Sequence, residues 1–232
     1  ILTRFYDYLK KFEAHLKRHP PSSPDQKLDL PQGINLPSVF RAMLCAGLLC
    51  HHYDFDGRAA AARAADPSGA PVPFSGGRVN EHVYRSLCNL ARPSLPPSVV
   101  LYAYKGIGQM IVRKPELLVS SHELIKRALS VTAASKLKHQ ALSSLRLLLT
   151  ADEDRQRTLT TPGATSSAKR SALAEMQIAS ETSAAVTGAL QRHLPSILAA
   201  LLDPRDARMV GVLGETTGEP ALGRMLRRME RH

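Results

Sequence analysis

The feature that most constrains this fold is an apolar repeat at spacings of three and four residues, interrupted at intervals by proline. The segment 1–18 shows it clearly, since it contains Ile1, Phe5, Leu9, Phe12 and Leu16. This spacing places the apolar side chains on one face of an α-helix. Pro20 and Pro21 then end the pattern, because proline lacks a backbone donor and clashes with the preceding turn.

The same alternation of helical pattern and breaker continues along the chain. Ser98 is predicted to cap one later helix, and Ser120 or Ser121 the next. Aromatic residues make up 5% of the chain and tryptophan is absent, which favours aliphatic helix packing over β-sheet. The sequence therefore predicts an all-α protein with further helices over 36–52, 80–91, 98–114, 120–129, 135–160, 173–193, 196–202 (separate or continuous with the one before), 205–213 and 220–231.

Two stretches of biased composition divide the helical pattern. RAAAARAADPSGAPVPFSGGR is rich in Ala, Pro and Gly and predicts an insertion loop, and a later segment predicts a linker. The expected organisation is first helices over 1–56, the loop over 57–79, helical repeats over 80–160, the linker over 161–172, further helices over 173–214 and a basic C-terminal helix over 215–232.

The length and hydropathy of the chain narrow its class. At 232 residues it is long enough to bury a core, in one large domain or two small ones. No run approaches the roughly 18 apolar residues of a membrane span, so we expect a soluble intracellular protein without membrane contact. The chain opens on Ile1 and not on methionine, which predicts a fragment of a longer protein.

An internal repeat with a period of about 40 becomes visible when the expected helices are superposed. AYKGIGQM, from Ala103, matches ALSSLRLL, from Ala141, at an offset of 38. The helix over 36–52 matches the first of these at an offset of 61, which falls to about 40 without the insertion loop. Helix pairs with this period are typical of HEAT and armadillo arrays. We therefore expect a HEAT-repeat α-solenoid of stacked antiparallel helix pairs, with Asp206 and Arg208 tying successive turns together.

One short stretch, LLCHHYDFD, concentrates residue types that bind zinc or relay protons. Adjacent histidines on a helix point about 100° apart, so His51 and His52 are poorly placed to chelate one ion. We interpret the stretch as a helix terminus, where Tyr53 and Phe55 anchor the chain to the core. Asp54 or Asp56 then caps a neighbouring backbone.

No enzymatic motif survives inspection of the remaining sequence. KGIGQM lacks the spacing and the lysine of a phosphate-binding loop, and its Gly106 and Gly108 are expected to admit a neighbouring helix closely. No strand-turn-helix elbow surrounds a serine. The three cysteines, Cys45, Cys50 and Cys88, lack metal-site spacing and are expected to be buried free thiols. The sequence thus predicts no catalytic residue, no metal and no cofactor.

Basic charge is the strongest functional signal. The net charge is +11, and residues 101–150 alone carry eight Lys or Arg against two Glu. A basic surface attracts nucleic acid or acidic proteins at long range, although it can also be a merely solvated helix face. The candidate contact residues for DNA or an acidic partner are Arg113, Lys114, Lys126, Arg127, Lys136, Lys138 and Arg146.

Several segments of the chain, in order, resemble one family. FRAMLCAGLLCHHYDFD is similar to a stretch of the Nipped-B-like cohesin loaders, in which such a helix also runs into an aromatic and acidic end. The resemblance continues through AYKGIGQMIVRKPELLVSSHELIKRALS, LKHQALSSLRLLLTADEDR and SETSAAVTGALQRHLPSILAALLDPRDARMVGVL. It covers roughly residues 36–56 and 80–213. The chain departs from the family in its alanine-rich insertion and in lacking a helix between Leu213 and GEPALGRM.

The resemblance implies a fragment from the C-terminal part of a cohesin loading factor. Such a factor, with its small partner subunit, loads cohesin onto chromatin in the nucleus and stimulates the ATPase of cohesin's SMC heads without hydrolysing ATP itself. It contacts the kleisin subunit and grips DNA without sequence specificity. The alternative is a generic HEAT or armadillo scaffold whose basic surface binds an acidic protein partner.

Overall fold

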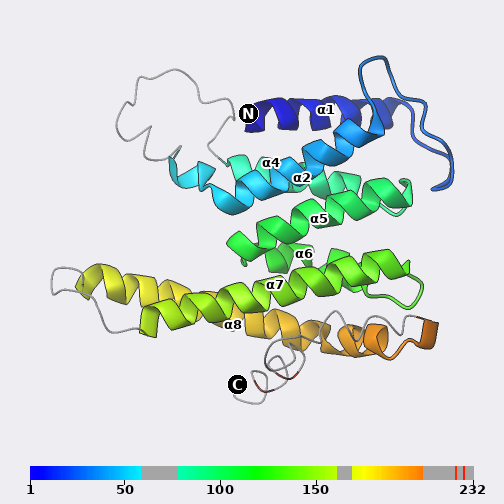
Figure 1. Ribbon diagram of the computed structural model, residues 1–232. Coiled ribbons are helices and arrows are strands. Elements are labelled where there is room, and N and C mark those ends of the chain that lie inside the picture. Colours follow the sequence, from blue (N-terminus) through cyan, green and yellow to red (C-terminus); the bar gives the residue numbers. More distant parts are fainter. Residues whose placement is uncertain (59–77, 161–168, 206–222, 224–226, 228–232) are drawn as a thin grey trace, which may run out of the picture. The chain divides into compact units, whose positions relative to one another are not determined.

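The computed structural model describes residues 1–58, 78–160, 169–205, 223 and 227 of the chain (Figure 1). Within these residues the chain is helical and contains no strand, so the all-α prediction is confirmed. It divides into two compact units, unit 1 over Ile1–Arg113 and unit 2 over Lys114–His232. The seven helices with defined bounds are α1 (Leu2–Arg18), α2 (Leu36–His52), α4 (Val79–Leu90), α5 (Pro97–Arg113), α6 (Leu117–Ala128), α7 (Ser135–Thr160) and α8 (Lys169–Leu201).

Most helix boundaries follow the expected breakers, but two predicted caps do not. Asn35 Oδ1 accepts a hydrogen bond from Ser38 N at 2.9 Å and caps α2, while α5 opens directly on Pro97. The predicted caps at Ser98 and at Ser120 or Ser121 are wrong, because both helices start earlier. Ser121 lies inside α6, where its hydroxyl donates to Leu117 O at 2.8 Å.

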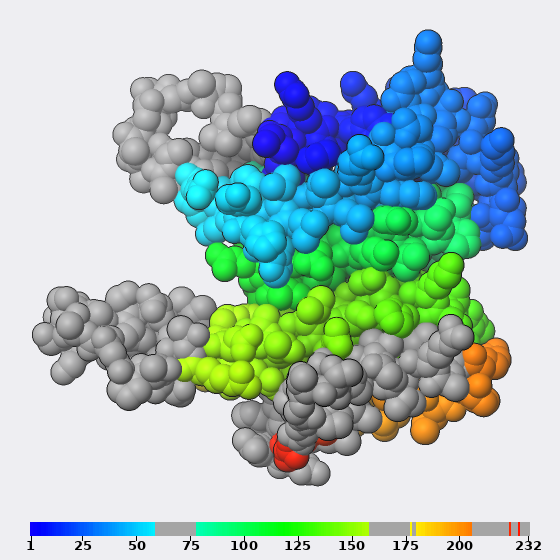
Figure 2. All heavy atoms as spheres, in the orientation of Figure 1, coloured from blue at the N-terminus to red at the C-terminus, as the bar shows by residue number. Residues whose placement is uncertain are grey.

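Unit 1 is built around the contact of α2 with α5. α1 packs on α2 and α4, and α4 packs on α5, so the four helices enclose one aliphatic core. In the space-filling view α2, in light blue, lies on the viewed face of this unit (Figure 2). The fully buried side chains of the core include Leu9, Phe12, Val39, Met43, Ala46, Val83, Leu87, Val99, Ala103 and Met110.

The contact between α2 and α5 is made backbone against backbone. A Cβ added at Gly47 would lie 2.6 Å from both Cα and O of Gly106. A Cβ added at Gly106 would lie 2.9 Å from Met43 O. Both distances are too short for a side-chain atom, so only glycine permits this crossing. The expectation that Gly106 admits a neighbouring helix is therefore confirmed.

The helices of unit 2 with defined bounds are α6, α7 and α8, each of which contacts the other two. α8 is continuous to Leu201 with Pro195 inside it, so the segment over 196–202 continues the preceding helix and is not a separate one. The buried aliphatic side chains of α7 and α8 include Leu142, Leu145, Leu148, Leu149, Val186, Leu190 and Ile197.

Several sequence predictions fall outside the described residues. They concern most of the insertion loop, residues 161–168 of the linker, the pair Asp206 and Arg208, and nearly all of the C-terminal helix. The boundary between the units lies within the block 80–160, which the sequence presents as one run of repeats. No helix in the described part of the chain is both long and apolar enough to cross a membrane.

Candidate functional site

The histidines of LLCHHYDFD lie at the end of α2, as expected. His51 Nδ1 lies 3.0 Å from the carbonyl oxygen of Gln109 in α5, so the ring donates there and ties the two helices. His52 is exposed and meets the His51 ring edge to face, at 4.7 Å between centroids. No group of three or more His, Cys, Asp or Glu side chains within the described ranges could hold a metal ion.

The aspartates of the same stretch cap backbones, which confirms their interpretation. Asp54 Oδ1 accepts from Gly57 N at 3.1 Å, and Asp56 Oδ1 accepts from Asn80 N, at the start of α4, at 3.2 Å. The anchor expected at Tyr53 is wrong, because that side chain is 45% exposed. Its ring instead lies against Arg58 and near the half-buried Phe55.

The cysteines are free thiols, as the sequence predicts, but only Cys50 is fully buried. Cys45 and Cys88 are half-buried. Burial raises the pKa of the Cys88 thiol to about 11, despite a smaller opposing effect of its hydrogen bond with Tyr84. A thiol with so high a pKa is a weak nucleophile at neutral pH.

The seven predicted contact residues occupy different environments. Arg113 is exposed at the end of α5 in unit 1, and the other six belong to unit 2. Lys126, Arg127 and Lys136 are exposed, whereas Lys114 and Arg146 are half-buried. Within the second unit, exposure alone therefore favours Lys126, Arg127 and Lys136 as contacts for a partner.

These three exposed cations, which we call the cationic end, flank the connection between α6 and α7. Lys126 and Arg127 are in the last turn of α6, and Lys136 is in the first turn of α7, beyond a short connection. No described residue forms an ion pair with any of them. A cation at a helix N-terminus opposes the helix dipole, so Lys136 is not placed there for stability.

Lys138 does not belong to this surface, and its predicted role as a contact is wrong. Its side chain is 1% exposed, and its Nζ lies 2.8 Å from Asp203 Oδ2. Asp203 also accepts from Arg205, through Nε at 2.9 Å and NH2 at 2.8 Å. These hydrogen bonds, led by those of Arg205, hold the pKa of the Asp203 carboxyl well below its usual range. Lys138 therefore fixes the start of α7 to the end of α8.

Arg205 is a residue that the sequence interpretation missed. Besides bonding Asp203, its guanidinium donates to Val131 O at 3.0 Å, in the connection between α6 and α7. It thus holds the connection that the cationic end flanks. The sequence feature that could have identified Arg205 is Asp203-Pro204-Arg205, where a carboxylate and a guanidinium flank a proline directly after a helix.

A second polar contact inside unit 2 joins α6 to α8. His122 Nδ1 and His193 Nε2 are 3.2 Å apart, and His193 is 2% exposed. Burial, together with smaller effects of His122 and Arg192, lowers the pKa of His193 to about 4. His193 is therefore neutral near pH 7, which lets the pair share one hydrogen bond.

Comparison with known proteins adds no relative to these observations. No family model, no curated protein and no solved structure matches the chain.

Proposed function

We propose that this chain is a helical scaffold that binds partners, and that it forms part of a cohesin loading factor. It binds DNA without sequence specificity, cohesin through its SMC heads and kleisin, and a small loader subunit, in the nucleus. It promotes loading of cohesin onto chromatin and stimulates the SMC ATPase without catalysing hydrolysis. Its helix pairs belong to a HEAT array.

The exposure of the cationic end supports binding to DNA. Its three exposed positive charges all fall between Lys126 and Lys136 and lack an ion-pair partner among the described side chains. Each such cation can neutralise one phosphate and release a counterion. Phosphate contacts of this kind position a protein on DNA without reading its sequence. The ordered resemblance of the sequence segments supports the assignment to a cohesin loader.

Duplex DNA binding tests the first part of the proposal. We expect the triple variant Lys126→Glu, Arg127→Glu, Lys136→Glu to bind two unrelated 30-base-pair duplexes at least about tenfold more weakly, and equally so. The slope of log K against log salt becomes shallower by about 3, because three fewer phosphates are neutralised. The control is Lys11→Glu, Arg41→Glu, Arg192→Glu, which reverses three exposed charges elsewhere. Equal affinity and slope in the two variants would refute DNA binding at the cationic end.

Cohesin itself tests the second part. We expect the full loading factor that contains this chain, together with the small subunit, to raise the rate of ATP hydrolysis by purified SMC heads in the presence of kleisin and DNA. The triple variant should lower that stimulation while the control retains it. A parent protein that neither binds cohesin in a pull-down nor changes its turnover would leave the alternative, a general scaffold that binds an acidic protein.

A further inference from the structure

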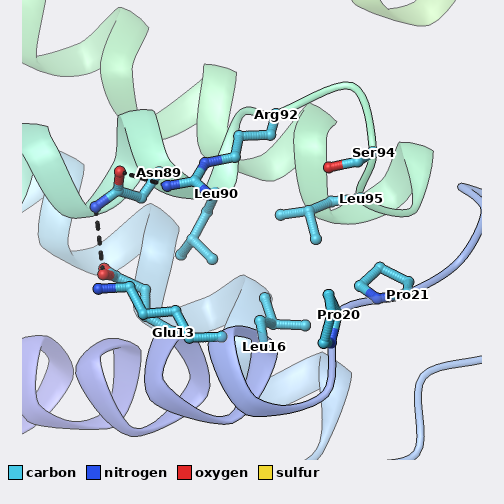
Figure 3. A pocket seen from close by; sticks show the side chains of 10 residues that line it. Glu13, Leu16, Pro20, Pro21, Asn89, Leu90, Arg92, Ser94 and Leu95 are labelled. Carbon is cyan, nitrogen blue, oxygen red and sulfur yellow. Dashed lines mark hydrogen bonds between the residues drawn. The ribbon is translucent and has the colours of Figure 1, made fainter.

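A hollow in unit 1, remote in sequence from the cationic end, has the build of a binding site. It lies between α1, α4 and the connection after α4, and its volume is about 330 Å³. Ligand pockets start at about 300 Å³, so it can hold one or two side chains. Leu16, Leu90 and Leu95 form its apolar lining, with Pro20 on one side (Figure 3).

One wall of the hollow is a chain of polar groups. Arg92 donates to Asn89 Oδ1 at 3.0 Å, and Asn89 Nδ2 lies 3.4 Å from Glu13 Oε2 (Figure 3). The Glu13 carboxylate is buried, accepts from Ser86, and pairs with Lys10 Nζ at 3.1 Å. Because Lys10 of the same helix pairs with Glu13, this carboxylate does not make the hollow acidic.

The charges at the mouth of the hollow are positive. Lys17 and Arg92 both line it and are exposed. A second hollow of about 320 Å³ shares Pro20 and Pro21 with the first and adds Lys27 and Asp29, whose opposite charges offset each other. An occupant of the first hollow therefore meets an aliphatic pocket beside two cations, which together complement an apolar group flanked by acidic ones.

The lining also distinguishes between classes of occupant. Single-stranded nucleic acid binds to proteins through aromatic platforms on which bases stack. The residues that line the first hollow include no aromatic side chain. An aliphatic side chain needs no such platform and gains about 1.5–3 kcal/mol when fully buried. A peptide fits this lining better than a nucleic acid does.

We propose that this hollow docks an extended acidic peptide of a partner protein, with one aliphatic side chain against Leu16, Leu90 and Leu95. Carboxylates on either side of that anchor pair with Lys17 and Arg92. The proposal goes beyond DNA binding by the cationic end and does not depend on it, because the residues involved belong to unit 1.

Fluorescence anisotropy with a defined probe tests the site on the full chain. The probe is a fluorescein-labelled peptide Glu-Glu-Leu-Leu-Asp-Glu, compared with one whose leucines are serine and one whose acids are lysine. We expect the variant Lys17→Glu, Arg92→Glu to bind the acidic leucine probe at least about tenfold more weakly than the unaltered chain. The charge-matched control Lys11→Glu, Arg41→Glu reverses exposed cations outside both hollows and should change affinity less than about twofold.

A second variant blocks the hollow without changing charge. Ser94 is exposed and lines the hollow, so Ser94→Trp should fill the hollow and weaken binding of the probe as strongly as the charge variant does. Ser98→Trp lies outside the lining and should not weaken binding. Circular dichroism checks that each variant keeps its helices. Equal binding by the charge variant and its control, or equal binding of the lysine probe, would overturn the proposal. So would a loss of duplex DNA binding in the Lys17→Glu, Arg92→Glu chain with no binding of any peptide.

Discussion

The two units of this protein both bury aliphatic side chains, but they differ in the other contacts that join their helices. In unit 1 the helices α2 and α5 cross in direct backbone contact, because no side chain lies between Gly47 and Gly106. In unit 2 pairs of buried or half-buried ionisable side chains join the elements: Lys138 pairs with Asp203, and His122 with His193. Unit 1 buries a carboxylate too, at Glu13, but next to an open hollow and not at its helix crossing.

The difference teaches where each unit is vulnerable. A close-packed crossing fails when volume is added, because interiors have little free space. A buried ionic contact fails when one partner or its charge state is changed, since the remaining group is left without compensation. Unit 1 should therefore be sensitive to added atoms, and unit 2 to the removal of a partner and to pH.

The largest effect is expected from removing the buried cation of unit 2. Lys138→Met should lower the free energy of unfolding by about 3 kcal/mol, the low end for breaking a buried pair, because Arg205 remains. The exposed Lys136→Met is the matched control and should change it by less than about 0.5 kcal/mol. Hydrogen exchange should show faster exchange of amides in α7 and α8. Equal loss of protection in α2 and α5 would contradict a defect confined to unit 2.

The next effect comes from adding one methyl group to unit 1. Gly47→Ala should destabilise by about 2 kcal/mol, because the new Cβ meets backbone atoms of Gly106 that cannot turn aside. Gly188→Ala, in α8, is the opposite case, since nothing lies within 4 Å of its added Cβ. There alanine should stabilise by up to about 1 kcal/mol through helix propensity. Urea unfolding measures both, and the same sign for the two would remove the distinction between the units.

A third effect is a pH dependence confined to unit 2. The pKa of His193 is lowered from 6.5 to about 4 in the folded state, mainly by burial. Below pH 6.5 the unfolded chain binds a proton there that the folded chain does not, so stability falls as pH drops toward 4. His193→Gln should flatten this fall in a series of thermal melts between pH 7.5 and 4.5. An unaltered slope, or the same flattening by the exposed His139→Gln, would show that another group titrates.

The all-α class and several helix positions were predictable because helix pattern and proline breakers are local properties of the sequence. The bounds of α1, α2 and α4 lie within a residue or two of their predicted positions. Of these, α2 is capped by Asn35 and carries Pro37 in its first turn. The start of α6 was wrong because Ser121 satisfies its hydroxyl by bonding back to Leu117 within the helix, a choice that cap preferences alone do not reveal.

The candidate site was less predictable than the fold, because burial of a charge depends on distant residues. Lys136 and Lys138 look equivalent in sequence, yet they lie about 200° apart around α7. Lys138 faces Asp203, 65 positions away along the chain, and is buried by it. Asp56 was placed correctly as a cap, but its partner Asn80 lies across the insertion loop. Local patterns thus give the type of group, and tertiary contacts decide which groups remain accessible.

The glycine crossing also limits how unit 1 can move. Helices that slide past one another are separated by side chains, which can change rotamer as the helices move. At Gly47 and Gly106 no such side chains lie between the helices, because the two backbones are in direct contact. We therefore expect this crossing to oppose sliding of α2 along α5 more than a tilt of the two helices about the contact point.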